Sequence, residues 1–148
     1  MNKAPESFPE FDIPVTVAEE FTGNVTPLLH EIRHAVQALL AEGETTTIDM
    51  RSMPLAPGEE TRIETLLGEG EIRVELNALG RSDIIETRFP GVWLITHRNT
   101  EDVILGKHIQ ISFIPDILKA QQRDIEAGLE QLSSELQTEP VNDSGEKP

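Results

Sequence analysis

A long amphipathic stretch lies between Thr26 and Gly43. At roughly 100° per residue, its apolar residues fall in one broad stripe of a helical wheel, at positions 28, 29, 32, 35, 36, 39 and 40. Thr26-Pro27 is typical of a helix start, with Thr as N-cap and Pro at the first helical position, and Gly43 is typical of a helix end. The wheel places His30, His34 and Gln37 almost opposite the apolar stripe, so we expect these side chains to face solvent or a partner.

The next residues predict short strands and one short helix. Apolar and polar residues alternate strictly over 71–79, which indicates a half-buried strand. A short helix is expected over 58–67, closed by Gly68. Residues 99–102 are expected to form a hairpin turn, and Gly106 to mark a bulge in the strand after it. The complete set of expected strands is 45–50, 71–79, 84–89, 92–98 and 103–114.

A second amphipathic helix is predicted from Pro115-Asp116 to about Leu136. Its apolar residues recur at helical spacing, at positions 118, 125, 129, 132 and 136. We expect this stripe to pack on the chain's own sheet, and the alternative is a seam between two copies in a homodimer. Taken together, the elements predict an α+β fold, with an antiparallel sheet of about four to five strands and two long helices and one short helix packed on it.

The two ends differ from this body in composition. Residues 1–22 contain three prolines, five acidic residues and one Lys, and predict a weakly ordered arm in which Phe11 to Val17 lies extended on the body. Residues 137–148 are polar and predict a disordered tail. The sequence therefore predicts one folded domain over 23–136.

Charge and cysteine content narrow the possible functions. The 148 residues carry a net charge of −15, which disfavours nucleic acid as a partner because phosphates are repelled. The absence of cysteine excludes disulfides and cysteine-ligated metal within this sequence. There is no apolar run of the roughly 20 residues that span a membrane and no signal-peptide pattern, so a cytoplasmic protein without membrane contact is expected.

The residues His30-Glu31-Ile32-Arg33-His34 match the zinc-protease pattern H-E-x-x-H. In that chemistry, two histidines one helical turn apart bind Zn²⁺ and the glutamate acts as general base. Arg33 opposes a nearby cation, and the third ligand is unclear, although Glu60 and Glu64 lie one turn apart downstream. We therefore favour an exposed polar face with no metal over two alternatives, a small zinc hydrolase using His30 and His34 and a weak Ni²⁺- or Zn²⁺-binding delivery surface.

Aromatic residues are scarce, and Phe89-Pro90-Gly91-Val92-Trp93 is their densest site. Core packing is the default role of these residues. An exposed aromatic edge beside a rigid Pro-Gly bend would instead suit contact with a protein partner. We select candidate partner-binding residues from three places: Phe89, Pro90, Gly91 and Trp93; His97, Arg98 and Asn99; and the helix face with His30, Arg33 and His34.

An ordered set of segments resembles the C-terminal conserved domain of the HupH/HyaF family of hydrogenase expression and formation proteins. The resemblance spans roughly residues 24–132 and is specific as a set. Its segments are LHEIRHA (29–35), IDMRSMPL (48–55), LGEGE (67–71), ALG (78–80), ETRFPGVW (86–93), THRN (96–99) and IPDIL (114–118).

The resemblance implies an accessory protein, a chaperone or scaffold, for maturation and assembly of uptake [NiFe]-hydrogenases. Its implied partners are a hydrogenase subunit precursor and other maturation factors, and it carries over no catalytic residue and no cofactor. Typical members are about twice this length, with another half before this domain, and here the 22-residue arm stands in its place. We expect a binding protein and not an enzyme.

Overall fold

The computed structural model describes residues 23–138. The expected arm over 1–22 and residues 139–148 of the expected tail lie outside the described residues. The chain divides into two compact units, 1–114 and 115–148, and each is described by itself.

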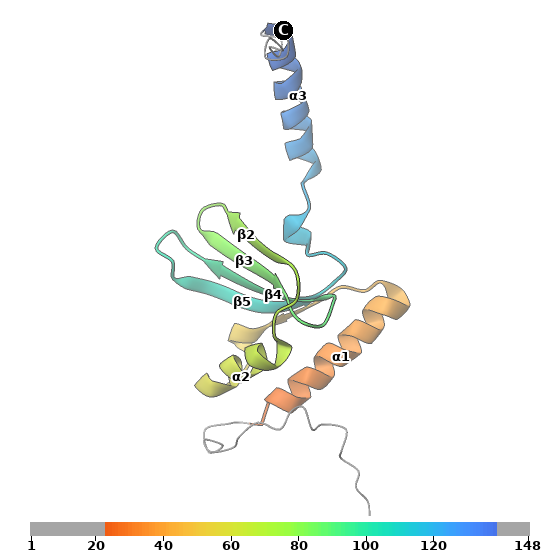
Figure 1. Ribbon diagram of the computed structural model, residues 1–148, viewed down its shortest axis with the longest axis vertical. Helices are drawn as coiled ribbons and strands as arrows, with labels where there is room; N and C mark the ends of the chain where they lie inside the picture. Colours follow the sequence, from red (N-terminus) through yellow and green to blue (C-terminus); the bar gives the residue numbers. More distant parts are fainter. Residues whose placement is uncertain (1–22, 139–148) are drawn as a thin grey trace, which may run out of the picture. The chain divides into compact units, whose positions relative to one another are not determined.

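The first unit is an antiparallel sheet with two helices (Figure 1). The helices are α1 (Val25–Glu42) and α2 (Pro57–Leu67), and a 3-10 turn, η4 (Met50–Ser52), precedes α2. The strands are β1 (Thr46–Asp49), β2 (Arg73–Asn77), β3 (Arg81–Glu86), β4 (Val92–Arg98) and β5 (Ile104–Ile111). The sheet order is β1-β5-β4-β3-β2, and every neighbouring pair is antiparallel. The α+β class and the five-stranded sheet are therefore confirmed.

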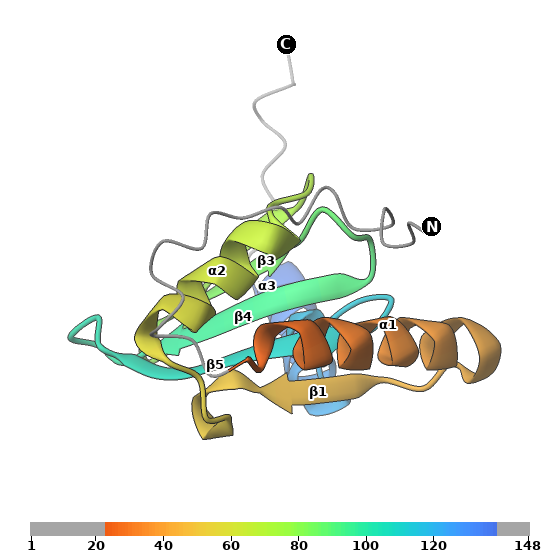
Figure 2. The ribbon, with the colours of Figure 1, turned by 90° about the horizontal axis from the view of Figure 1, so that it is seen from below.

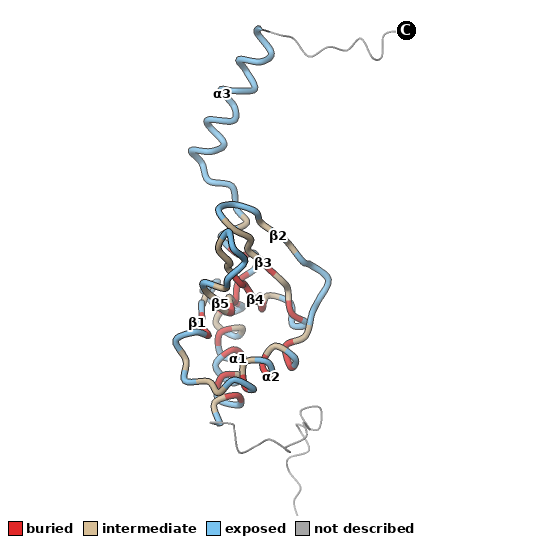
Figure 3. Tube along the Cα trace, turned by 90° about the vertical axis from the view of Figure 1, so that its left-hand side faces the viewer, coloured by how far each residue is buried: buried red, intermediate tan, exposed pale blue. Residues whose placement is uncertain are grey.

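The main core lies between α1, α2 and one face of the sheet (Figures 2 and 3). Ile109 and Ile111 on β5 and Val92 on β4 meet Ile63 and Leu67 of α2 in one apolar cluster. Each such fully buried side chain contributes about 1.5–3 kcal/mol of transfer free energy. The apolar residues Ile63, Leu66 and Leu67 of the short helix are buried.

Helix α1 begins earlier than predicted. Asn24 is its N-cap and Pro27 lies within the first turn, whereas Thr26 was expected to be the cap. The Asn24 side chain makes no capping hydrogen bond and instead donates to the Pro54 carbonyl oxygen at 3.0 Å. The predicted end is confirmed, because Gly43 adopts a left-handed conformation (φ 71°) and its N–H donates to the Leu39 carbonyl.

Two strands differ most from prediction. β3 was expected over 84–89 and instead covers Arg81–Glu86, three residues earlier. β2 covers only Arg73–Asn77, and as an edge strand it leaves Val74 and Leu76 only half-buried. The β2–β3 turn uses Gly80 at φ 118°, where an added Cβ would collide with the Arg98 carbonyl oxygen. The hairpin between β4 and β5 is confirmed. The bulge is confirmed as well, since Arg98 pairs with Ile104 and His97 with Gly106, which leaves one extra residue between them.

The second unit contains a 3-10 turn, η5 (Asp116–Leu118), and the helix α3 (Gln122–Thr138). The helix therefore begins later than the predicted Pro115, and Leu118 is not part of it. No residue of α3 is buried, and its apolar side chains Ile125, Leu129, Leu132 and Leu136 are 48–62% exposed. The expectation that this stripe packs on the chain's own sheet stays a prediction, because helical spacing shows that an apolar side exists and does not show what covers it. Among residues 23–138, no helix has the length and apolar character needed to cross a membrane.

Candidate functional site

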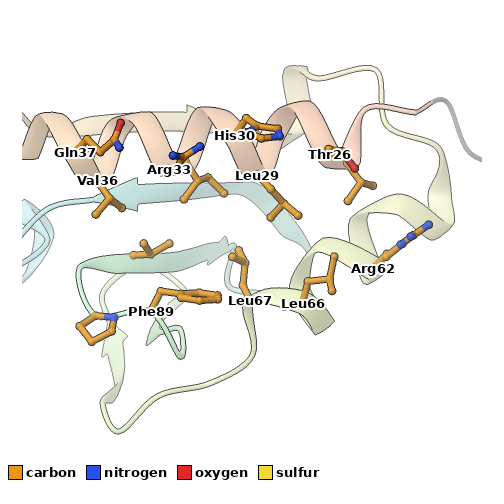
Figure 4. Close-up of a pocket in the computed structure, with 14 residues that line it drawn as sticks. Thr26, Leu29, His30, Arg33, Val36, Gln37, Arg62, Leu66, Leu67 and Phe89 are labelled. Atoms are coloured by element: carbon orange, nitrogen blue, oxygen red, sulfur yellow. The ribbon is translucent and has the colours of Figure 1, made fainter. Parts of the chain in front are cut away.

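A groove with a volume of about 830 Å³ lies between α1, α2 and the loop before β4 (Figure 4). Residues of α1 form one side, and residues of α2 with Phe89 form the other. Its apolar lining is Val25, Leu29, Ile32, Val36, Leu66, Leu67, Phe89, Pro90 and Val92. We call this site the α1–α2 groove.

The floor of the groove includes residues from the apolar stripe of α1 that are only partly buried. Leu29 and Val36 lie next to the core cluster and line the groove, whereas Leu28 and Leu39 on the same helix are buried. The apolar stripe of α1 is thus wider than its buried side. Apolar surface of this kind is typical of sites that bind another polypeptide segment.

Among the described residues, the polar residues of the groove carry positive charge. They are Thr26, His30, Arg33, Gln37 and Arg62, and no Asp or Glu of residues 23–138 lines it. The whole sequence has 27 acidic and 12 basic residues, so this local composition is opposite in sign to that of the chain. Arg33 makes no ion pair with any residue between 23 and 138. The groove therefore favours a partner with both apolar and acidic groups.

The loop that carries Phe89 and Pro90 is held in place by partly buried hydrogen bonds. The buried Thr87 hydroxyl accepts from the Phe89 N–H at 3.1 Å and donates to the Phe89 carbonyl at 3.2 Å. Arg88 Nε donates to the Leu66 carbonyl, and the Arg88 guanidinium lies 4.7 Å from the centre of the Phe89 ring. Phe89 is 40% exposed and lines the groove, so the loop leaves part of this aromatic residue accessible there. The sequence interpretation did not identify Thr87 and Arg88 as its supports.

Trp93 does not present an exposed edge, which corrects that part of the partner-binding set. It is 3% exposed, and its indole N–H donates to the Ser112 carbonyl oxygen at 3.0 Å. Val92 faces the groove, so Trp93, the next residue along β4, faces the opposite side of the sheet. Its role is packing, the default that was expected for the aromatic segment.

The candidate residues His97, Arg98 and Asn99 lie at the other end of β4 from Phe89 and are engaged within the chain. His97 Nδ1 is 2.8 Å from the Ser82 hydroxyl, and Arg98 Nε is 3.5 Å from Asp83 Oδ2. The Asn99 side-chain oxygen accepts from two backbone N–H groups of the hairpin. The structure therefore brings Phe89 and Pro90 together with His30 and Arg33, and leaves 97–99 apart from the groove.

His108 on β5 is expected to make stability fall in mild acid. Burial, with a smaller contribution from the positive charge of nearby His97, holds the pKa of His108 below 6.5, against the opposing effect of Asp49. His108 therefore binds a proton more readily in the unfolded chain than in the folded chain. The contribution of neutral His108 to stability is complete above about pH 6.5 and is lost as pH falls towards the lower folded pKa. The free energy of unfolding, measured in urea at pH 7.5 and 5.5, should differ less between the two pH values in His108→Asn than in the native chain. An equal pH effect in both proteins would contradict this origin.

The histidines of the H-E-x-x-H pattern are both exposed on α1. His30 lines the groove, and His34, one turn further, is not among the lining residues. Between residues 23 and 138, no group of three or more His, Asp or Glu side chains is placed to hold a metal ion. The downstream carboxylates considered as further ligands, Glu60 and Glu64, instead bind Lys107 Nζ at 2.8 and 2.6 Å.

The Lys107 ion pairs join β5 to α2 and are expected to add stability up to high pH. Burial lowers the pKa of Lys107, but hydrogen bonds to Glu60 and Glu64 and the negative charges of both raise it, and the result lies above 10.5. The contribution is therefore complete below about pH 10.5 and is lost as pH rises through the folded pKa. Lys107→Arg, which stays charged in this range, should lose less stability than the native chain between pH 9.5 and 11.5 in urea titrations. A loss as large as that of the native chain would contradict the assignment.

Glu59 is a buried carboxylate that positions both helices of the groove. It is 0% exposed, with Oε2 accepting from the Gly23 N–H at 3.0 Å and Oε1 accepting from the Ala56 N–H at 2.9 Å. The second bond caps the start of α2, and the first anchors the residues that lead into α1. A glutamate in the first helical turn is a recognisable capping signal. Its bond to Gly23, 36 residues away, has no such signal.

Comparison with known proteins agrees with this geometry. Residues 22–138 match the family described as "HupH hydrogenase expression protein, C-terminal conserved region". A solved structure, the hydrogenase expression protein HupH from Thiobacillus denitrificans ATCC 25259, is similar with a TM-score of 0.75 and 38% identity, covering 78% of this chain and 97% of that one.

Two curated relatives are longer proteins. The hydrogenase expression/formation protein HoxQ of Azotobacter vinelandii is 27% identical over 114 residues, which are 74% of this chain and 39% of the relative. HupH of Rhodobacter capsulatus is 25% identical over 84 residues, 57% of this chain and 30% of the relative. The chain thus matches less than half the length of these relatives. It belongs to the family of the C-terminal conserved region of HupH hydrogenase expression protein.

Proposed function

We propose that this chain acts as an accessory protein in the assembly of [NiFe]-hydrogenase by binding a hydrogenase subunit precursor. Family membership supports a hydrogenase-related role, because the named relatives are hydrogenase expression or formation proteins. In this proposal the chain holds the precursor transiently as a chaperone or scaffold, together with other maturation factors. The encounter takes place in the cytoplasm, the compartment that we expect from the sequence.

The observation that carries the proposal is the α1–α2 groove. Its volume is that of a site for several side chains, and its lining combines an apolar floor with Arg33, Arg62 and His30. An incompletely folded subunit exposes apolar side chains that such a floor can cover, and recognition of a chain segment in a groove is a common mode of protein binding. Phe89 and Pro90 would supply the rigid anchor, Gly91 would shape their loop, and His34 would flank the site.

The polar groups of the groove favour binding over catalysis. Among the described lining residues, His30 has no Asp or Glu beside it and so no His–carboxylate pair for general acid–base work is present there. Thr26 is the hydroxyl-bearing residue among them. We assign neither residue a catalytic role.

A pull-down with the full chain tests the proposal. Immobilised chain is exposed in turn to the precursors of both hydrogenase subunits, each in the form that precedes metal-cluster insertion. Retention of at least one precursor, reduced when the groove is altered by Val36→Asp, is expected. The matched control is Val103→Asp, an exposed valine outside the groove. Retention of neither precursor would overturn the proposed function.

A further inference from the structure

We propose that residues 1–22 of this chain occupy the α1–α2 groove, with their apolar side chains on its floor and their carboxylates beside Arg33 and Arg62. This inference concerns one chain alone and does not depend on the hydrogenase assignment. It makes the groove a site that an external partner must share with, or take from, the chain's own first residues.

The composition of residues 1–22 matches what the groove accepts. The segment has five acidic residues and one Lys, and it contains three of the five phenylalanines of the chain. Between Phe11 and Val17, apolar residues occupy every second position, with Asp12, Pro14 and Thr16 between them. In an extended conformation this alternation produces one apolar side and one polar side. Such a segment can cover an apolar floor while it keeps acidic groups at a positive rim.

The charges of the groove suit an acidic segment. Among the described residues, the lining contains Arg33, Arg62 and His30 and no carboxylate, within a sequence of net charge −15. Arg33 has no ion-pair partner among the described residues. A carboxylate that approaches Arg33 is therefore attracted by its positive charge.

The described part of the chain begins beside the groove. Gly23 is tied to Glu59 of α2, and Val25 and Thr26, just after it, already line the groove. Gly23 has φ 87°, a conformation that suits glycine and allows the backbone to change direction at this point. The segment before Gly23 is therefore attached at one end of the site.

The segment 1–22 is long enough to extend along the groove. Along α1 the lining extends from Val25 to Gln37, which is about 18 Å at 1.5 Å per residue. About six extended residues span that distance at about 3.3 Å each. The stretch from Phe11 to Val17 has this length, and the residues between it and Gly23 are available for the reversal.

Attachment also makes weak contacts effective. A segment joined to its site by a short linker experiences an effective concentration on the order of millimolar. A modest intrinsic affinity then keeps the groove occupied, and a client polypeptide binds only by displacing the segment. The proposal therefore predicts competition between residues 1–22 and any partner that uses the groove.

Paramagnetic relaxation in the full chain tests the proposal. Because the sequence has no cysteine, Thr16→Cys introduces a single attachment site for a nitroxide. The methyl signals of Leu29 and Val36 in the groove are compared with those of Leu79, in the turn between β2 and β3, and Leu105, near the start of β5. Neither Leu79 nor Leu105 is among the lining residues. The groove methyls are expected to lose most of their intensity when the nitroxide is oxidised, and Leu79 and Leu105 to keep most of theirs.

Two charge reversals make the result specific. Arg33→Glu should restore the groove methyl signals, and Arg51→Glu, an exposed arginine outside the groove, should leave them broadened. Broadening no greater in the groove than at Leu79, or unchanged by Arg33→Glu, would overturn the proposal.

A mixture of nitroxide-bearing chain without isotopes and isotope-labelled chain without nitroxide tests whether the segment of a second copy occupies the groove instead. Groove broadening in that mixture equal to that of the single chain would contradict occupation by the chain's own segment.

Discussion

Replacing Glu59 with alanine is expected to lower the free energy of unfolding by about 3 kcal/mol. The substitution removes the acceptors of the Gly23 and Ala56 N–H groups and leaves a cavity where a fully buried side chain stood. Both helices that form the groove lose an anchor at their first turn. Urea unfolding followed by the fluorescence of Trp93, the single tryptophan, measures the change.

Glu69→Ala is the matched control for Glu59→Ala. Glu69 is also a glutamate near one end of α2, but it is exposed and pairs only with the exposed Arg73 at 2.9 Å. Surface pairs of this kind contribute about 0–1 kcal/mol, so the control should change stability little. Equal losses in the two variants, both below about 1 kcal/mol, would show that Glu59 does not anchor the helices.

Phe89→Ala is expected to weaken binding of a hydrogenase subunit precursor by about tenfold or more, with little change in stability. Phe89 is the aromatic side chain that the rigid loop holds at the groove, and aromatic anchors in preformed sites carry a large share of binding energy. It is 40% exposed, so its truncation removes contact surface more than core packing. Equilibrium titration of the full chain with labelled precursor measures the change.

The chain contains a matched control for Phe89. Phe113 is 70% exposed and does not line the groove. If the groove is the binding site, Phe113→Ala should bind the precursor as the native chain does. A Phe113→Ala effect as large as that of Phe89→Ala would place binding elsewhere on the surface.

The parts of the fold that depend on local pattern were predictable from the sequence. β4 was predicted with its observed bounds, and the hairpin and the bulge beside Gly106 were predicted from turn and glycine signals. Gly43 was predicted as the end of α1. These features depend on residues close in sequence, because the conformational preferences of turn and cap residues and the spacing of apolar residues determine them.

The groove was not predictable in the same way. Its lining combines residues of 25–37, 62–67 and 89–92, and their meeting depends on how α1 and α2 lie on the sheet. The helical wheel correctly placed both histidines on the exposed side of α1, but it could not show that His30 lines a groove and His34 does not. It also could not show that Leu29 and Val36, on the apolar stripe, stay only partly covered.

Which side of an apolar element is covered was not predictable from the sequence either. Trp93 alternates with Val92 along β4, and the sequence does not state which of two apolar neighbours faces the helices. The apolar stripe of α3 is a real amphipathic pattern, yet no residue of that helix is buried. Periodicity predicts that an apolar side exists, and tertiary or partner contacts decide what covers it.

Equilibrium titration of the full native chain with each purified [NiFe]-hydrogenase subunit precursor tests the proposed function most directly. Saturable binding of at least one precursor is expected, weakened about tenfold by Phe89→Ala and unchanged by Phe113→Ala. No saturable binding of either precursor, with both precursors shown to be competent for assembly, would contradict the proposed function.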